Sequence, residues 1–499
     1  MSESPFSVPR RQDPLGVIIL FGQNLRNMVR ILAGLVFASV YSDWGIFSVT
    51  NIVLFGTLIM AVYTVFQYLR FKFYIAGDEL ILEKGVFRRE RLSIPLDRIQ
   101  TVHLSQNLLQ QVIQLTGVRI DTAGSGQEEL KISALKREDA LALQALLEGS
   151  NEEVKNQSLE GEVAPQAPRK TLVELTIPKL LVVGLTQNHL RSGLIAFAVV
   201  WGYLVQFEDV IRDYLDVNLD YSPEEVEQAV SSIEFGMTLI AFMILTFLAI
   251  SVMISLVRTV IRHFGLKATL GPKTIQVSSG LIKRNEFTIP LNKIQIMRWQ
   301  GNYLRRIPGF ESVLIRQGRS GAQPSELNVE IPACYTDQTQ ALEQAIYGPE
   351  MEEPLHAYSP HPFSWVYMST WALVIGLLPF GIAFLLLEDW KVALAYALYA
   401  LIAILWVRKF VSTISLSTNG SLIQYRKGWL STDRSLIKVY KIQSMTYRQS
   451  IFQARRGTAH LTLYTAGGSL TMRFMPESLV KELHNYYLYK VEVSEESWM

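Results

Sequence analysis

Gly280-Leu281-Ile282-Lys283-Arg284, followed after four residues by Ile289-Pro290-Leu291-Asn292-Lys293-Ile294-Gln295, is a pattern that the chain uses three times. The other copies run from Gly85 to Ile94-Pro95-Leu96-Asp97-Arg98-Ile99-Gln100 and from Gly428 to Ile437-Lys438-Val439-Tyr440-Lys441-Ile442-Gln443. In every copy the glutamine follows the glycine by fifteen residues. A pattern that recurs at constant spacing marks repeated structural units. The sequence therefore predicts three related modules.

Long uncharged segments precede each module. Gly45 to Leu69, Phe235 to Val257 and Phe363 to Leu387 each exceed the roughly 20 apolar residues that cross a bilayer as a helix. Three shorter apolar runs lie beside them: Ile31 to Ser42, Ser192 to Phe207 and Val392 to Val407. We expect each short run to pair with a long one. This gives six transmembrane helices in three hairpins.

The distribution of basic residues predicts the orientation. The turns of the hairpins, residues 43–51, 208–232 and 388–391, contain only Arg212 and Lys391 as basic residues, whereas Lys and Arg are frequent on the opposite flanks. Cytoplasmic flanks of membrane spans are enriched in Lys and Arg. We therefore expect a multi-pass protein of the bacterial cytoplasmic (inner) membrane, with both termini and all three modules in the cytoplasm.

Each module reads as a small β-sheet closed by a helix. Strand pairs with turns are expected in 71–87, 266–277 and 411–425, and further strands in 118–122, 313–317 and 459–465. The closing helices are expected at 139–147, 339–346 and 477–487. Two leading segments, 15–25 and 178–190, read either as helices in the membrane interface or as packed cytoplasmic helices.

These elements define the expected domain boundaries. The chain divides into hairpin 1 with its leading segment (1–69), module 1 (70–148), a linker (149–177), hairpin 2 with an acidic outer loop (178–257), module 2 (258–347), a second linker (348–362), hairpin 3 (363–407) and module 3 (408–491).

A wider set of residues resembles a known family. The third motif is followed by Gln449-Ser450-Ile451-Phe452-Gln453-Ala454-Arg455-Arg456-Gly457 and by Leu461-Thr462-Leu463-Tyr464-Thr465-Ala466-Gly467-Gly468. Together with the repeated motif, these residues resemble the bacterial pleckstrin-homology (PH)-like domain membrane proteins, in the three-module layout of the YdbT type. Two departures stand out: Lys438 replaces the motif proline, and Gly301 stands where the other copies have Gln106 and Gln449.

The resemblance implies a membrane α + β protein. Each hairpin would be followed by a PH-like β-sheet domain with a C-terminal helix, and the protein would act at the cell envelope. The resemblance implies no catalytic residue and no cofactor.

The residues themselves also predict no enzyme. The seven histidines lack metal-ligand spacing, Cys334 is the single cysteine, and the common nucleophile, phosphate-binding and zinc motifs are absent from the sequence. The expected spans contain no ionisable residue, whereas transport pathways usually need some. A transport or lipid-handling device, with hairpins lining a path, is the alternative function.

Local basic charge gives the candidate contact residues. Residues 258–320 contain twelve Lys or Arg against two acids, and residues 408–460 contain ten against one. The candidate lipid or partner contacts are Lys283, Arg284, Arg298, Arg305, Arg306, Arg426, Lys427, Arg434, Arg448, Arg455 and Arg456. These charges can equally be solvated surface residues and positive-inside signals. Aromatic residues such as Trp299 and Tyr303 read as core or interface residues, so nucleic acid is not an expected partner.

The expected partners are membrane lipids, anionic lipids among them, and either a second copy of the chain or a smaller single-module PH-like membrane relative. The acidic outer loop, 208–234, contains nine carboxylates and reads as a solubilising loop or as a site for divalent cations or cationic peptides. We expect a non-enzymatic protein whose modules mediate assembly or anionic-lipid contact in cell-envelope maintenance or stress resistance.

Overall fold

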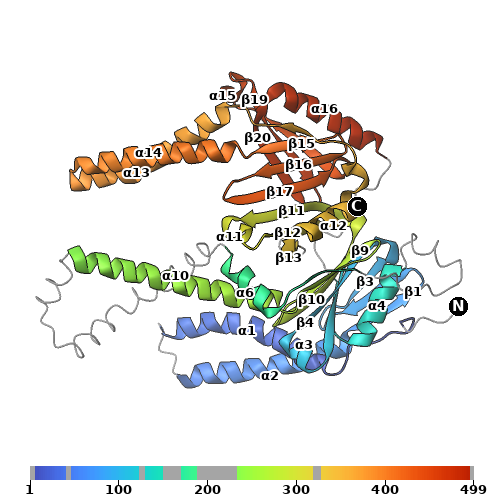
Figure 1. The fold of residues 1–499 in the computed structure, drawn as a ribbon. Coiled ribbons are helices and arrows are strands. Elements are labelled where there is room, and N and C mark those ends of the chain that lie inside the picture. The colour runs from blue at the N-terminus through green and yellow to red at the C-terminus, as the bar shows by residue number, and fades with distance from the viewer. Residues whose placement is uncertain are drawn as a thin grey trace, which may run out of the picture.

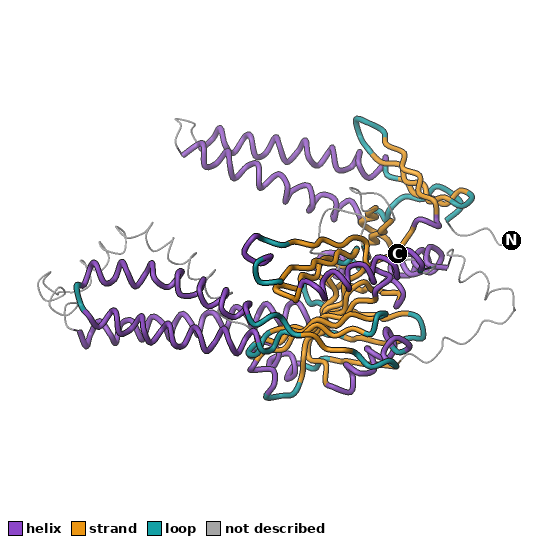
Figure 2. The backbone as a smooth tube through the Cα atoms, turned by 90° about the horizontal axis from the view of Figure 1, so that it is seen from above, coloured by secondary structure: helices purple, strands orange, loops and turns teal. Residues whose placement is uncertain are grey.

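The computed structural model describes residues 6–40, 46–122, 130–149, 170–187, 233–318 and 328–494 of the 499-residue chain. Three modules follow one another, and the long helices that precede them extend to the same side of the sheets (Figure 1). Seen from above, the long helices again extend to one side of the strands (Figure 2). The expected alternation of membrane helices and β-rich modules is therefore confirmed.

Every module contains two antiparallel sheets, a short helix and a closing helix. Module 1 consists of β1 (Lys72–Ala76), β2 (Glu79–Lys84), β3 (Glu90–Pro95), β4 (Ile99–Asn107), α3 (Leu108–Val112), β5 (Leu115–Thr122), β6 (Leu130–Lys136) and α4 (Arg137–Gly149). The apolar faces of both sheets and of α4 form one buried core. The expectation of a single small sheet per module is thus refined to two packed sheets.

Modules 2 and 3 repeat this order and add one strand. Module 2 consists of β7 (Lys170–Glu174), β8 (Lys267–Leu270), β9 (Thr274–Ser279), β10 (Lys283–Pro290), β11 (Ile294–Asn302), α11 (Tyr303–Arg306), β12 (Phe310–Gln317), β13 (Asn328–Tyr335) and α12 (Thr336–Tyr347). Module 3 consists of β14 (His356–Tyr358), β15 (Ser415–Thr418), β16 (Leu422–Lys427), β17 (Ser431–Lys438), β18 (Ile442–Arg448), α15 (Ile451–Ala454), β19 (Thr458–Thr465), β20 (Gly468–Pro476) and α16 (Glu477–Val493).

The added strands come from segments that precede the hairpins. β7 pairs with β8, and β14 pairs with β15. In module 1 the corresponding contact is a single bridge between Arg10 and Phe73. Both expected linkers, 149–177 and 348–362, therefore contribute an edge strand to the module that follows, whereas residues 150–169 lie outside the described part of the chain.

The sheets run across the module boundaries. One seven-stranded sheet has the order β6-β5-β4-β10-β9-β8-β7, and a second has the order β13-β12-β11-β17-β16-β15-β14. The second sheet of one module is therefore continuous with the first sheet of the next. The sheets at the two ends of the molecule, β1-β2-β3 and β18-β19-β20, remain three-stranded.

The repeated motif forms the bend between the two sheets of a module. Gly85, Gly280 and Gly428 have positive φ angles of 104°, 114° and 89°. A Cβ at any of them would lie about 2 Å from the carbonyl oxygen of the residue three positions later, so the turn requires glycine. The Ile-Pro-Leu or equivalent segment then enters a 3-10 turn, η1 (Leu96–Arg98), η2 (Leu291–Lys293) or η4 (Val439–Lys441).

The motif glutamine lies at a β-bulge. The strand register shifts across this position in all three copies. Ile294 is buried, with 2% of its surface exposed, and the next residue, Gln295, is also buried, with 1% exposed. Simple strand alternation, which would point Gln295 to solvent, is therefore wrong at this position. The side chain packs against Gly318 and Gly467, the latter in the β19–β20 turn of module 3.

Helices α1 (Gly16–Val40), α2 (Ile46–Arg70), α6 (Ile177–Leu185), α10 (Ile233–His263), α13 (Phe363–Leu387) and α14 (Trp390–Val411) form the other layer. Within the described residues, four segments are long and apolar enough to cross a bilayer: Val53–Arg70, Leu245–His263, Phe363–Leu386 and Trp390–Val411. Six spans are expected, and four are found in the described part of the chain. Residues 192–207, expected to be the third span, lie outside the described residues.

The two leading segments form different structures. Residues 15–25 do not form a separate element, because α1 continues through them to Val40. α6 packs on α10, where Gly184 lies against Leu256, and it buries Leu180 and Val183 in the core of module 2. Its Ile177 is 59% exposed. α6 therefore packs on module 2 through one face, as expected for a packed cytoplasmic helix, the second of the two interpretations.

Candidate membrane and module-binding surfaces

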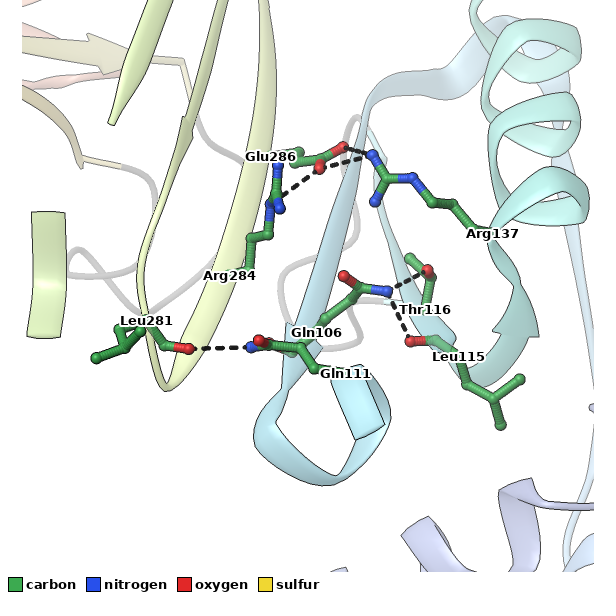
Figure 3. A network of polar contacts seen from close by, with 8 residues as sticks. All are labelled: Gln106, Gln111, Leu115, Thr116, Arg137, Leu281, Arg284 and Glu286. Carbon is green, nitrogen blue, oxygen red and sulfur yellow. Dashed lines mark hydrogen bonds and ion pairs between the residues drawn. The ribbon is translucent and has the colours of Figure 1, made fainter. Parts of the chain in front are cut away.

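The first junction pairs β4 of module 1 with β10 of module 2. Asn107 lies opposite Lys283, and Leu104 lies opposite Glu286. The first residue of α4, Arg137, binds both carboxylate oxygens of Glu286 at 2.9 and 3.2 Å (Figure 3). Arg284 lies 3.4 Å from the same carboxylate. Two cations from different modules therefore share one acid across this strand pair.

Side-chain amides complete this junction. Gln111 donates to the carbonyl oxygen of Leu281 at 3.2 Å, in the turn that follows the motif glycine (Figure 3). Gln106 turns toward its own module, where its amide donates to the Leu115 carbonyl oxygen at 2.9 Å and the Thr116 hydroxyl at 3.0 Å. Gln449 donates equivalently to Thr458 in module 3. Gln106 and Gln449, which occupy equivalent positions in modules 1 and 3, therefore have a structural role.

The second junction pairs β11 with β17 in the same register. Asn302 lies opposite Ser431, and Trp299 lies opposite Arg434. The Arg434 guanidinium stacks on the Trp299 ring at 4.2 Å and forms an ion pair with Glu343 of α12. Arg298 contacts Asp433 at 3.4 Å. Two of the candidate residues, Arg298 and Arg434, are therefore engaged between modules.

A buried lysine also holds this junction. Lys441, only 1% exposed, donates to the carbonyl oxygens of Asn292 and Ile294 in module 2, the latter at 2.6 Å. The Arg306 guanidinium donates to the Trp429 carbonyl oxygen at 2.7 Å. These groups link the motif of module 3 to the motif of module 2.

The short helices α3, α11 and α15 follow the junction strands. Asn107 and Ser450 accept the N3 backbone hydrogen bond and form capping boxes with Gln110 and Gln453. In α11 the third residue is Arg305, which is 8% exposed and donates to the Ser312 hydroxyl at 2.7 Å. Burial lowers the pKa of the Arg305 guanidinium from its ordinary value. Because this side chain points inward, its assignment as a lipid contact is corrected.

The outer faces of these helices are apolar and exposed. Their exposed side chains are Leu108, Leu109 and Val112 on or beside α3, Tyr303, Leu304 and Ile307 on or beside α11, and Ile451 and Phe452 on α15. We call these residues, with the motif turns 85–87, 280–282 and 428–430, the apolar tips. Exposed apolar side chains repeated at equivalent positions indicate a contact surface.

The apolar tips lie against the membrane helices. Phe87, 94% exposed, stacks on Tyr63 of α2 with ring centroids 6.2 Å apart. Trp429 contacts Trp406 of α14 at 5.0 Å. The backbone of Leu281 bonds to Ile261 of α10. Tyr63 precedes the end of α2 at Arg70 by seven residues. Phe87 therefore lies about 10 Å from that end of the helix, in the direction of the membrane.

The remaining candidate cations are exposed. Arg448, Arg455 and Arg456 surround α15, and Arg456 lies over the Phe363 ring at 5.3 Å. Lys283 and Arg284 lie beside the turn of the first junction, at the tip end of β10. Arg426 and Lys427 extend from the corresponding end of β16. The exposed candidates therefore gather near the apolar tips of modules 2 and 3.

An open cleft of about 600 Å³ lies between α13 and α15. Aromatic residues Phe363, Tyr367 and Phe474 line it, together with Arg448 and His460. The His460 Nδ1 accepts a hydrogen bond from the backbone of Phe474 at 2.9 Å. Burial, reinforced by Arg473, lowers the pKa of His460. The cleft thus combines apolar walls with a cation at the membrane-facing end of module 3.

Two further features of the described residues concern metal-binding and thiol groups. They contain no group of three His, Cys, Asp or Glu side chains that could hold a metal ion. Cys334 is buried, and burial raises its thiol pKa to about 12. A second cavity, of about 420 Å³, lies at the second junction and is lined by Glu343 and Arg434, which pair with each other.

Sequence reasoning missed the junctions themselves. Charge counting placed Arg298 and Arg434 on a binding surface but could not identify their partners, since Asp433 and Glu343 lie in other elements. The sequence marks only the end of each strand that precedes a short helix, through the capping residues Asn107, Asn302 and Ser450, and it does not identify the strand's partner.

Comparisons with known proteins agree with the three-module architecture. The family model described as Bacterial PH domain matches residues 27–151, 226–349 and 372–491, and each match contains one copy of the motif. The chain is similar to the UPF0699 transmembrane protein YdbT of Bacillus subtilis (strain 168), with 24% identity over 425 residues, which is 81% of this chain and 80% of the relative. The predicted repeats and the resemblance are confirmed.

Proposed function

The chain belongs to the bacterial PH domain family, and from this premise we propose that it is a non-enzymatic inner-membrane protein whose modules rest on anionic lipid of the cytoplasmic leaflet. In this proposal three hairpins provide six spans, and the modules form a layer beneath the bilayer. The resemblance to a bacterial transmembrane protein with the same module layout supports a role at the cell envelope, in its maintenance or in stress resistance.

The observation that carries the proposal is the position of the apolar tips. All three modules present exposed apolar residues beside the module-side end of a membrane helix, as Phe87 does on α2 and Trp429 does on α14. Amphipathic segments with apolar side chains and flanking cations lie in the headgroup region. The apolar tips therefore match the headgroup region of the bilayer.

The cations near the tips favour anionic lipid. A Lys or Arg close to an anionic leaflet contributes about 1 kcal/mol. Arg455 and Arg456 are exposed at the tip of module 3 and thus both suit this contact. Since the hairpins already anchor the chain, this energy orients the modules and collects anionic lipid rather than recruiting the protein to the membrane.

Lipid retention by the intact protein tests the proposal. The full-length protein would be reconstituted in nanodiscs of equal phosphatidylglycerol and phosphatidylcholine, released and analysed by native mass spectrometry. We expect wild-type protein to retain mainly phosphatidylglycerol, and Arg455→Gln/Arg456→Gln to retain less. The matched control is Lys273→Gln/Lys490→Gln, which removes the same charge away from the tips. Equal retention of both lipids by the wild type would contradict the proposal.

A further inference from the structure

The two ends of the molecule carry complementary halves of the junction that it uses twice internally. Each junction joins two kinds of strand. One kind ends at a short helix and is represented by β4 and β11. The other kind follows a motif glycine and is represented by β10, which pairs with β4, and by β17, which pairs with β11. In the described part of the chain, the equivalent strands β18 and β3 are terminal in their sheets. We propose that β18 of one copy pairs with β3 of a second copy, in the register of the internal junctions.

The exposure of β18 supports an open junction. In β11 the inward positions Met297 and Trp299 are 0% and 1% exposed. Their equivalents on β18, Met445 and Tyr447, are only partly buried. An unpaired edge strand with such side chains is a template for another strand.

The register follows from the two internal examples. Asn107 lies opposite Lys283 and Asn302 opposite Ser431, so the residue before the short helix faces the third residue after the motif glycine. By the same rule Ser450 faces Arg88. Arg448 then lies directly opposite Glu90.

Side-chain complementarity agrees with this register. Arg448 and Glu90 have opposite charges, and opposed charges across a strand pair are favourable. Tyr447 would face Arg91, as Trp299 faces Arg434 at 4.2 Å in the second junction.

The pair at the start of the closing helix is also complementary. The first junction contains Arg137 of α4 with Glu286 of β10. Their equivalents are Glu477, the first residue of α16, and Arg91. In the proposed pair the acid lies on the helix and the base on the strand, the reverse of the first junction, so the two side chains still attract each other. Glu477 currently contacts Lys481 and Gln449, on its own module.

Arg98 supplies an independent observation. Its equivalent in module 3, Lys441, is buried and binds two carbonyl oxygens of the preceding module. Arg98 is exposed, and its side chain has no hydrogen bond or ion pair with any described residue. In the proposed pair it would reach the carbonyl oxygens of Tyr440 and Ile442 in the second copy. Arg98 thus lacks a preceding module, whereas Lys441 of module 3 binds the carbonyl oxygens of module 2.

The geometry requires another molecule and a shared membrane. β3 belongs to module 1, at the opposite end of the molecule from β19 of module 3 (Figure 1), so one chain does not close on itself. Both internal junctions leave the hairpins on one side of the sheets (Figure 1). A third junction would thus place the hairpins of the next copy in the same bilayer. Such head-to-tail contacts give rings when they close and filaments when they do not.

Disulfide trapping in the full-length protein tests the proposal. In a background with Cys334→Ser, Glu90→Cys protein and Arg448→Cys protein would be reconstituted together in vesicles and oxidised. We expect a linked dimer from the mixture and none from either variant alone. The off-register control mixes Glu90→Cys with Thr446→Cys and should give at least about tenfold less dimer.

Charge exchange provides a second readout. Glu90→Arg and Arg448→Glu should each weaken self-association by about tenfold or more, measured by mass photometry, and the double variant should restore it. The proposal would be overturned if the mixture gave no linked dimer. It would also be overturned if one variant alone formed as much linked dimer as the mixture, or if a different protein were found bound at β18. Lipid retention is measured separately, so failure here leaves the lipid proposal standing.

Discussion

Replacing Lys441 with methionine tests whether a buried ammonium holds the second junction together. Lys441 is 1% exposed and donates to the carbonyl oxygens of Asn292 and Ile294. Methionine fills a similar volume but cannot donate. A buried carbonyl that loses its partner costs roughly 1–3 kcal/mol, and removing a buried charge offsets part of that cost. We expect the junction to weaken by about 2–4 kcal/mol.

Hydrogen exchange with mass spectrometry measures this change locally. Because every 1.4 kcal/mol is a factor of ten, a loss of about 3 kcal/mol accelerates exchange of the β11 and β17 amides roughly 100-fold. The control is Arg98→Met, an exposed residue at the equivalent position of module 1, which should leave exchange in dilute detergent unchanged. Unchanged exchange in Lys441→Met, or equal acceleration in β19 and β20, would refute the reasoning.

Three further predictions concern orientation, stability and pH. Lys391→Cys should react with an impermeant thiol reagent from outside the cell, while Cys334 stays silent because it is buried with a raised pKa; labelling only after lysis would reverse the orientation. Ile294→Ala should cost about 2–5 kcal/mol in denaturant unfolding, against a small effect of Leu141→Ala, which is 43% exposed. Because burial lowers the pKa of His460, the unfolded state binds more protons, so module 3 should lose stability as the pH falls below about 6.5; His460→Gln should remove this dependence, and an unchanged pH profile would contradict it.

The elements inside each module could be predicted from the sequence because their signals are local. The Gly271-Pro272 turn separates β8 from β9, and Asn419-Gly420 separates β15 from β16. The closing helices begin within three residues of their expected starts. The burial of Gln295 could not be predicted, because it depends on a bulge and on Gly467 of the next module.

The candidate surface was predictable only in part. Clusters of Lys and Arg identified the basic regions, and Arg455 and Arg456 are indeed exposed. The same signal included Arg305, which folds inward onto Ser312. The pairing of strands between modules left no local mark, since backbone hydrogen bonds form the sheet and carry no sequence signature of their partner.

The charges at the junctions nevertheless specify the order of the modules. Glu286 and Arg434 occupy equivalent positions, six residues after the motif glycine. The first junction offers Arg137 to that position, and the second offers Glu343. Exchanging the partners would bring Arg434 to Arg137 and Glu286 to Glu343, so that both incorrect pairings place like charges together. Because specificity is a difference between correct and incorrect pairings, these two acid–base pairs favour β10 on β4 and β17 on β11, although both junctions use the same strand register.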